Sequence, residues 1–142
     1  MLKTSKGFTL IELMIVITII ALIAGIGIPS YLKQVVKTRR SDAKVALTEL
    51  AQLQESFFAD NQTYTGDLAK LGKTAQGGVF LSPEEYYKLE IPSAGARTFL
   101  MKATPIGGQA NDDEVCQTFT INAAGEKKAT GKSGDTSDEC WG

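Results

Sequence analysis

Hydrophobic residues are distributed very unevenly along this chain. A short basic and polar stretch, residues 1–7, is followed by an almost unbroken apolar run over residues 8–28. As a helix this run is roughly 31 Å long at ~1.5 Å per residue, close to the hydrocarbon thickness of a bilayer. The pattern therefore predicts a helix that is held in a membrane at some stage.

The pattern changes after this run. Over residues 29–61 apolar residues recur at steps of three and four, which predicts that the helix continues with one face on a soluble core. The opposite face is expected to carry Lys33, Lys37, Arg40, Lys44, Glu49 and Glu55. Gly25, Gly27 and Pro29 lie at the junction, where Pro removes a hydrogen-bond donor and Gly weakens helices. We expect a helix break or an easily unwound turn there.

The rest of the chain has the pattern of a sheet. Residues 62–85 are rich in Gly and are expected to form a loop. Alternating apolar and polar residues then predict four strands, at 86–91, 97–104, 115–122 and 126–130. Residues 122–125 suit a tight turn, and Gly107–Gly108 suits a looser one. The expected fold is α+β, with one long N-terminal helix on a four-stranded antiparallel sheet within residues 86–142.

Composition argues against an enzyme. The 142 residues have a formal net charge of -1 and contain no His, so the usual general base and commonest metal ligand are absent. Asp112, Asp113 and Glu114 form an acidic cluster, which we interpret as a solvated turn rather than a calcium site. We expect no catalytic residue, metal or cofactor.

The two cysteines, Cys116 and Cys140, lie in the last third of the chain. An even pair behind an export-type N-terminus favours one disulfide formed in an oxidising compartment. Two unrelated buried thiols are the alternative. A disulfide would fasten the segment after the last strand to the sheet.

One charge interrupts the apolar run, at Glu12. A carboxylate in such a run is costly unless it has a partner, and nothing in the run is basic. Cleavage after Gly7 would create a free amine on Phe8, four residues from Glu12, and a neighbouring copy could offer that amine to Glu12. A secretory signal cut near Gly25 or Gly27 and a plain membrane anchor are the competing interpretations.

Residues 7–17, GFTLIELMIVI, resemble the signature of type IV pilins and pseudopilins. This resemblance implies cleavage between Gly7 and Phe8 by a prepilin peptidase, methylation of the Phe8 amine, and docking of subunits through Glu12. It also implies an inner-membrane precursor that an assembly platform polymerises into an extracellular pilus with other pilin subunits. Lys3 and Lys6 predict a cytoplasmic N-terminus and a periplasmic C-terminal domain.

The expected domains follow from this resemblance. Residues 1–7 are a leader peptide, 8–28 the transmembrane and filament-core helix, 29–61 the amphipathic half of the helix, 62–85 a loop, and 86–142 the sheet with a disulfide-bounded C-terminal region. Segments in residues 57–142, such as TFLMKATP and ECWG, resemble the PilE-type minor pilins of Gram-negative bacteria.

The expected function is that of a structural pilus subunit that supports pilus assembly, twitching motility, adhesion or DNA uptake. One alternative is a DNA-binding minor pilin for natural transformation, in which a basic strip of Lys127, Lys128 and Lys132 contacts phosphates. A second alternative is a pseudopilin of type II secretion, which shares the same N-terminal signature.

Overall fold

The computed structural model describes residues 7–142, which form two compact units, one up to Val35 and one from Val36 to Gly142. A single long helix, α1 (Leu10–Asn61), contributes to both units. Its first part makes up nearly all of the described first unit. The second unit contains residues 36–61 of α1 and all of the strands.

The helix break expected at Gly25, Gly27 and Pro29 is not present, because α1 continues through all three residues. Pro29 cannot donate the backbone hydrogen bond of its turn. The loss of one donor does not end a helix when the turns on either side remain helical. The expectation of a break is therefore wrong for a single copy of the chain.

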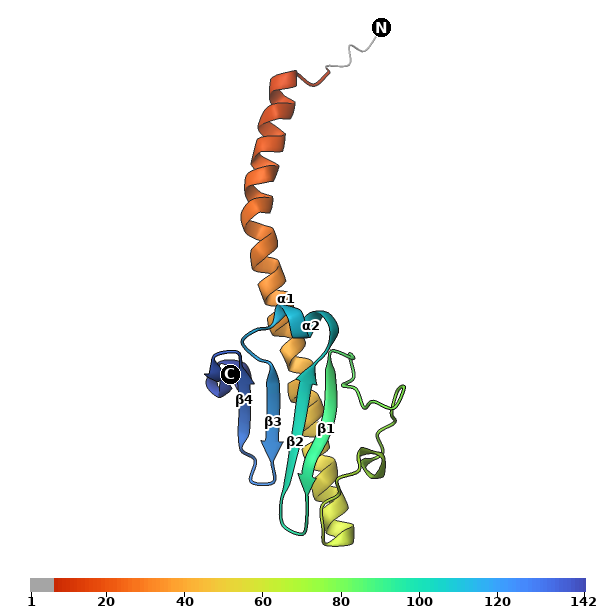
Figure 1. Cartoon of the computed structure of the whole chain (residues 1–142). Coiled ribbons are helices and arrows are strands. Elements are labelled where there is room, and N and C mark those ends of the chain that lie inside the picture. The colour runs from red at the N-terminus through yellow and green to blue at the C-terminus, as the bar shows by residue number, and fades with distance from the viewer. Residues whose placement is uncertain (1–6) are drawn as a thin grey trace. The chain divides into compact units, whose positions relative to one another are not determined.

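The second unit holds one antiparallel sheet in which chain order and strand order agree, as Figure 1 shows for β1 to β4. Its strands are β1 (Tyr87–Ala94), β2 (Phe99–Pro105), β3 (Thr118–Asn122), β4 (Lys127–Gly131) and β5 (Gly134–Asp135). The sheet thus has five strands, not the four expected. The fifth strand has two residues, which is too short to leave an alternating pattern in the sequence. The tight turn expected at residues 122–125 joins β3 to β4.

Three short helices occupy segments that were expected to be irregular. They are the 3-10 helix η1 (Leu68–Leu71), α2 (Gly107–Asp112) and α3 (Ser137–Trp141). The loop expected over residues 62–85 therefore contains one helical turn, and the Gly107–Gly108 turn begins a helix. Such elements are shorter than the window over which apolar periodicity can be recognised.

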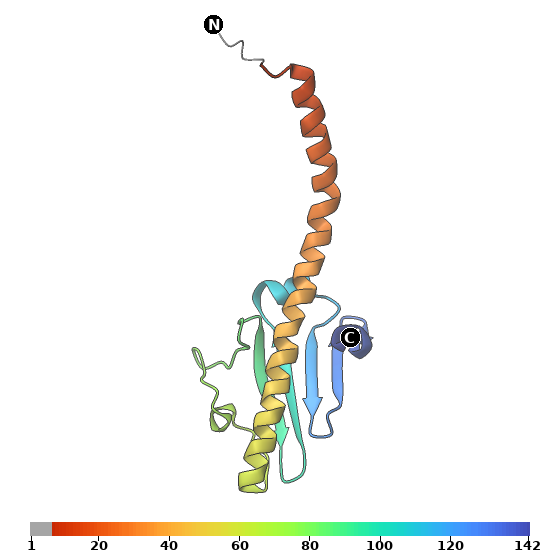
Figure 2. The same cartoon turned by 180° about the vertical axis from the view of Figure 1, so that it is seen from behind.

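The core lies between the sheet and residues 36–61 of α1, which cross one face of the sheet in Figures 1 and 2. Leu47 and Leu50 of the helix meet Tyr87, Met101 and Phe119 of the strands, and all five side chains are buried. Burial of this apolar area is the main favourable contribution to folding of this unit.

Polar side chains of α1 fix the ends of the loop before β1. Gln54 is fully buried, and its amide donates to the Thr65 carbonyl at 2.6 Å and accepts from the Thr65 N–H at 3.0 Å. Asp42 accepts hydrogen bonds from the Ser82 hydroxyl and from the Glu84 N–H at 3.1 Å. Polar groups of a loop have no strand or helix partner, and these two side chains supply hydrogen-bond partners for them.

Gly131, at the end of β4, lies against the backbone of the segment before β3. A Cβ at this position would stand 2.1 Å from the Val115 carbonyl oxygen. We expect Gly131→Ala to lower the free energy of unfolding by about 1–3 kcal/mol, near the upper end, because backbone must move to admit the methyl group. Denaturant unfolding measures this loss. Gly95→Ala is the matched control, since nothing lies within 4 Å of its Cβ, and equal stability of the two variants would contradict the prediction.

Candidate functional site

The first unit exposes an apolar helix surface along its whole length. Phe8 is 84% exposed and Ile23 is 67% exposed, and between Leu10 and Leu32 only Ala24 is half-buried. By length and composition, α1 contains a segment able to cross a membrane. Exposed apolar surface of this extent marks a membrane segment or an interface with other molecules.

The start of α1 is closed by a capping box made of Thr9 and Glu12. The Glu12 carboxylate accepts from the Thr9 N–H and from the Thr9 hydroxyl, both at 2.9 Å. The Thr9 hydroxyl in turn accepts from the Glu12 N–H at 3.3 Å. The carboxylate, which has no basic partner in the apolar run, therefore has hydrogen-bond donors within its own first turn.

Sequence reasoning missed Thr9, although the spacing Thr-x-x-Glu at the start of an apolar run is the signature of a capping box. Gly7 and Phe8 precede the helix and are exposed. The expected cleavage site therefore lies in non-helical, exposed backbone directly before the cap. The remaining residues of the expected leader, with Lys3 and Lys6, lie outside the described residues.

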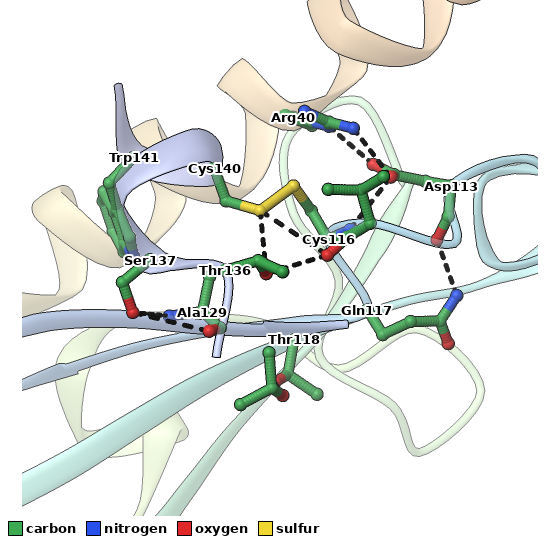
Figure 3. The surroundings of a disulfide bond; sticks show 12 residues. Arg40, Asp113, Cys116, Gln117, Thr118, Ala129, Thr136, Ser137, Cys140 and Trp141 are labelled. Atoms are coloured by element: carbon green, nitrogen blue, oxygen red, sulfur yellow. Dashed lines mark hydrogen bonds and ion pairs between the residues drawn. A yellow bond between two sulfur atoms is a disulfide. The ribbon is translucent and has the colours of Figure 1, made fainter. Parts of the chain in front are cut away.

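Cys116 and Cys140 form the disulfide that the sequence favoured, with their Cα atoms 5.8 Å apart (Figure 3). Because the two sulfurs are bonded to each other, the alternative of two unrelated thiols is wrong, and both residues are fully buried. The bridge joins the start of the β3 segment to α3. Beside it the Thr136 hydroxyl donates to the Val115 carbonyl at 2.8 Å, so a hydrogen bond supports the same connection.

A buried ion pair lies next to the disulfide (Figure 3). The Arg40 guanidinium donates to both carboxylate oxygens of Asp113, at 2.7 and 2.9 Å. Asp113 also accepts from the Gln109 amide at 3.1 Å and from the Cys116 N–H at 3.0 Å. Two expectations are corrected here, because Arg40 was placed on the solvent-facing side and Asp113 in a solvated turn, whereas they are 7% and 1% exposed.

The exposure of these two residues was predicted wrongly because the residues around each of them in the sequence give no sign of its distant partner. A charged residue in an amphipathic pattern is usually exposed, and burial becomes acceptable only when an opposite charge with good geometry is present. Arg40 and Asp113 are 73 positions apart in the chain. The acidic run therefore contributes one carboxylate to the interior rather than three to solvent.

The three lysines expected to form a basic strip are separated in the structure. Lys127 pairs with Ile121 and Lys128 with Thr120, so successive side chains of β4 point to opposite faces of the sheet. The Lys132 ammonium lies 2.6 Å from the Glu114 carboxylate. A continuous strip of Lys127, Lys128 and Lys132 does not form, although each residue remains exposed.

Within residues 7–142 no group of three or more His, Cys, Asp or Glu side chains is arranged to hold a metal ion. The features with a functional geometry are therefore the exposed apolar helix, its capped start at Thr9 and Glu12, and the region around the disulfide. The exposed apolar helix offers a surface suited to a membrane or to other helices. The disulfide region ties the chain after β4 to the segment before β3.

Comparison with protein families identifies two matching segments. The family described as "Type IV minor pilin ComP, DNA uptake sequence receptor" matches residues 29–120. The family described as "Prokaryotic N-terminal methylation motif" matches residues 2–28. The two matches together extend from the N-terminal segment into β3.

Several relatives are pilus proteins. Fimbrial protein EcpC of Eikenella corrodens is 40% identical over 137 residues, which are 85% of this chain and 86% of EcpC. The major component of the wide type IV pilus of Thermus thermophilus is 37% identical over 109 residues, 75% of this chain and 79% of the relative. The major pilin PilA of Myxococcus xanthus is 39% identical over 74 residues; the match covers 52% of this chain and only 34% of that protein.

A solved structure, the non-core minor pilin PilV of Neisseria meningitidis, has the same fold. Its TM-score is 0.53 at 24% identity, over 70% of this chain and 90% of the other. Type IV pilins with an apolar N-terminal helix of this kind start as membrane-anchored precursors and assemble into an extracellular pilus. The chain therefore belongs to the type IV pilins, with a domain of the ComP minor-pilin family, and is a subunit of a type IV pilus.

Proposed function

We propose that the chain is cut between Gly7 and Phe8 by a prepilin peptidase, methylated on the new Phe8 amine, and polymerised through residues 8–28. The observation that carries this proposal is the apolar surface of residues 8–32, which is exposed in a single copy, whereas the apolar face of residues 36–61 of α1 is buried against the sheet. Such a surface is satisfied by lipid before assembly and by neighbouring helices in a filament. In this proposal the second unit forms the outer surface of the pilus.

The proposed precursor lies in the inner membrane with a cytoplasmic N-terminus and a periplasmic C-terminal domain. Lys3 and Lys6 support this orientation, since cytoplasmic flanks carry the positive residues of membrane helices. The buried disulfide also fits an oxidising compartment for the second unit. Assembly requires an inner-membrane platform, and the resulting pilus serves twitching motility, adhesion or DNA uptake.

Glu12 is proposed to have two successive sets of partners. In the single copy its carboxylate accepts from Thr9 within the capping box. During assembly it accepts a charge-assisted hydrogen bond from the Phe8 amine of a neighbouring subunit, which is stronger than a bond to a neutral donor. This exchange would fix the axial register between subunits.

Mass analysis of the protein recovered from sheared pili tests the processing step. We expect a chain that begins at Phe8 and carries one additional methyl group on its amine. The same analysis of a strain without prepilin peptidase should give the uncut chain, which serves as the control. A mature protein that begins at any other residue would overturn the proposal.

Replacing Glu12 with Ala tests the docking step separately. We expect normal cleavage but a reduction of roughly tenfold or more in the amount incorporated into pili, because each subunit contact loses one interhelical polar interaction. Immunoblots of sheared pili and of membranes measure the two pools. Thr9→Val is the matched control, as it disturbs the cap but keeps the carboxylate; equal incorporation of Glu12→Ala and the unmodified protein would remove the docking role.

DNA binding is a second candidate function. The matching family is described as a DNA uptake sequence receptor, and the second unit carries lysines that form no ion pair among the described residues, including Lys127 and Lys128. Phosphate contacts release counterions, so affinity should fall steeply as salt rises.

A gel-shift titration with the full-length protein in a neutral detergent tests this candidate. We expect the protein to bind a short duplex at low salt. The logarithm of the binding constant should fall linearly with the logarithm of the salt concentration, with a slope of about -0.9 for each phosphate contacted. A duplex with the same composition in scrambled order reports sequence preference. Absence of binding at low salt would remove the candidate and leave the pilus function unaffected.

A further inference from the structure

Two lysine ammonium groups lie against a single residue, Trp141. The Lys44 ammonium donates to the Trp141 carbonyl at 3.1 Å, and the Lys127 ammonium lies 5.2 Å from the centroid of the indole ring. Lys44 comes from α1, Lys127 from β4 and Trp141 from α3. Three elements that are distant in the sequence thus bring two like charges to one place.

Trp141 is held firmly in this position. Its indole N–H donates to the Lys128 carbonyl at 2.9 Å, and its ring packs edge to face on Phe119 with centroids 5.7 Å apart. The preceding residue, Cys140, is bound to Cys116 by the disulfide. The two ammonium groups are therefore positioned by a rigid part of the fold rather than by a loose loop.

Among the ion pairs of the described residues, none involves the Lys44 or the Lys127 ammonium. The nearby Arg40 already engages Asp113. Burial, followed by the charges of Arg40 and Lys127, lowers the pKa of Lys44. Like charges in proximity raise the free energy of the folded state, and a bound anion would relieve that repulsion.

We propose that Lys44 and Lys127 together bind the phosphate backbone of DNA beside Trp141. This inference rests on the second proposed function and assigns it a contact. Lysine binds phosphate as a compact point charge and reads no base sequence, so the contact would strengthen attachment without selecting a sequence. Asp138 and Glu139 are exposed on α3, close to Trp141 in the chain, and their negative charges oppose the binding of phosphate. Attraction of phosphate to the site therefore requires both lysines.

The sequence contains one tryptophan, so its fluorescence reports on this site alone. We expect the emission of Trp141 to change when a short unlabelled duplex is added to the full-length protein in neutral detergent, and to recover when salt is added. The double variant Lys44→Gln with Lys127→Gln should bind at least tenfold more weakly. Its salt slope should be smaller in magnitude by roughly 1.8, since two phosphate contacts are lost.

A matched control removes the same charge elsewhere. Lys70→Gln with Lys88→Gln changes one lysine on η1 and one on β1 that is paired with Glu90. We expect its affinity to fall less than threefold, with an unchanged fluorescence response. Lys127→Gln alone keeps the bond from Lys44 to Trp141, so its slope change of roughly 0.9 is measured in a protein with that contact intact.

The outcomes separate this site from DNA binding in general. A gel shift without a change in Trp141 fluorescence would show that DNA binds elsewhere. An equal loss of DNA affinity in the two double variants would likewise rule out a specific role for Lys44 and Lys127, while DNA binding itself would stand. Absence of any gel shift would overturn DNA binding itself. Normal DNA binding by the Lys44 and Lys127 variant, combined with poor incorporation into pili, would also overturn the site and assign these lysines to a contact with an acidic surface of another subunit.

Discussion

Replacing Arg40 with Met is expected to lower the free energy of unfolding by about 3–5 kcal/mol. The substitution keeps a long apolar stem but leaves the Asp113 carboxylate buried without its counter-charge. The remaining donors to that carboxylate, the Gln109 amide and the Cys116 N–H, are neutral. Removal of one partner from a buried pair is costly because the other charge stays away from water.

Denaturant unfolding of the full-length protein in neutral detergent measures this effect, with Trp141 fluorescence as the signal from the second unit. Arg39→Met is the matched control: Arg39 lies 3.9 Å from Asp112, and both side chains are partly exposed. Exposed pairs contribute little, so the control should lose less than about 1 kcal/mol. Similar losses in the two variants would show that Arg40 does not stabilise the fold through Asp113.

Removal of the disulfide by the double substitution Cys116→Ala and Cys140→Ala should cost about 3–4 kcal/mol. The bridge closes a span of 24 residues, and in the chain-entropy model its main effect is to restrict the unfolded chain. Both sulfurs are also buried, so the alanines leave small cavities in the core. Because α3 lies at one end of the bridge, the emission of Trp141 should shift toward that of solvated indole as α3 loosens.

The same detergent unfolding assay measures this loss. Cys116→Ala alone is the informative control, since it abolishes the bridge with only one cavity and should lose nearly as much stability as the double variant. Reduction of the unmodified protein with a thiol should give a comparable loss without any substitution. If the oxidised, unmodified protein and the double variant have the same free energy of unfolding, the bridge does not stabilise the fold.

Features that depend on neighbouring residues were predicted well from the sequence. The helix was expected to end at residue 61 and α1 ends at Asn61, because the apolar repeat is long and is closed by turn-forming residues. Strand positions were correct to within a few residues for β1 to β4. Local rules fail where the element is very short, as for β5 and α2.

Features that depend on distant partners were predicted poorly. Arg40 and Asp113 were both expected in solvent, and each is buried only because the other is present. The basic strip failed for a related reason, since the pleat of β4 separates Lys127 from Lys128 and Glu114 engages Lys132. The pairing of Lys44 and Lys127 around Trp141 joins residues that no spacing in the sequence connects.

Periodicity, composition and short motifs are properties of contiguous residues. They were enough to predict the membrane-length helix, the pilin signature at residues 7–17, the α+β class and the favoured cysteine pair. Which charges are buried, whether the helix continues past Pro29 and which lysines lie together became visible only in the folded chain. Those outcomes depend on the dielectric surroundings and on partners that the fold brings together from distant parts of the chain.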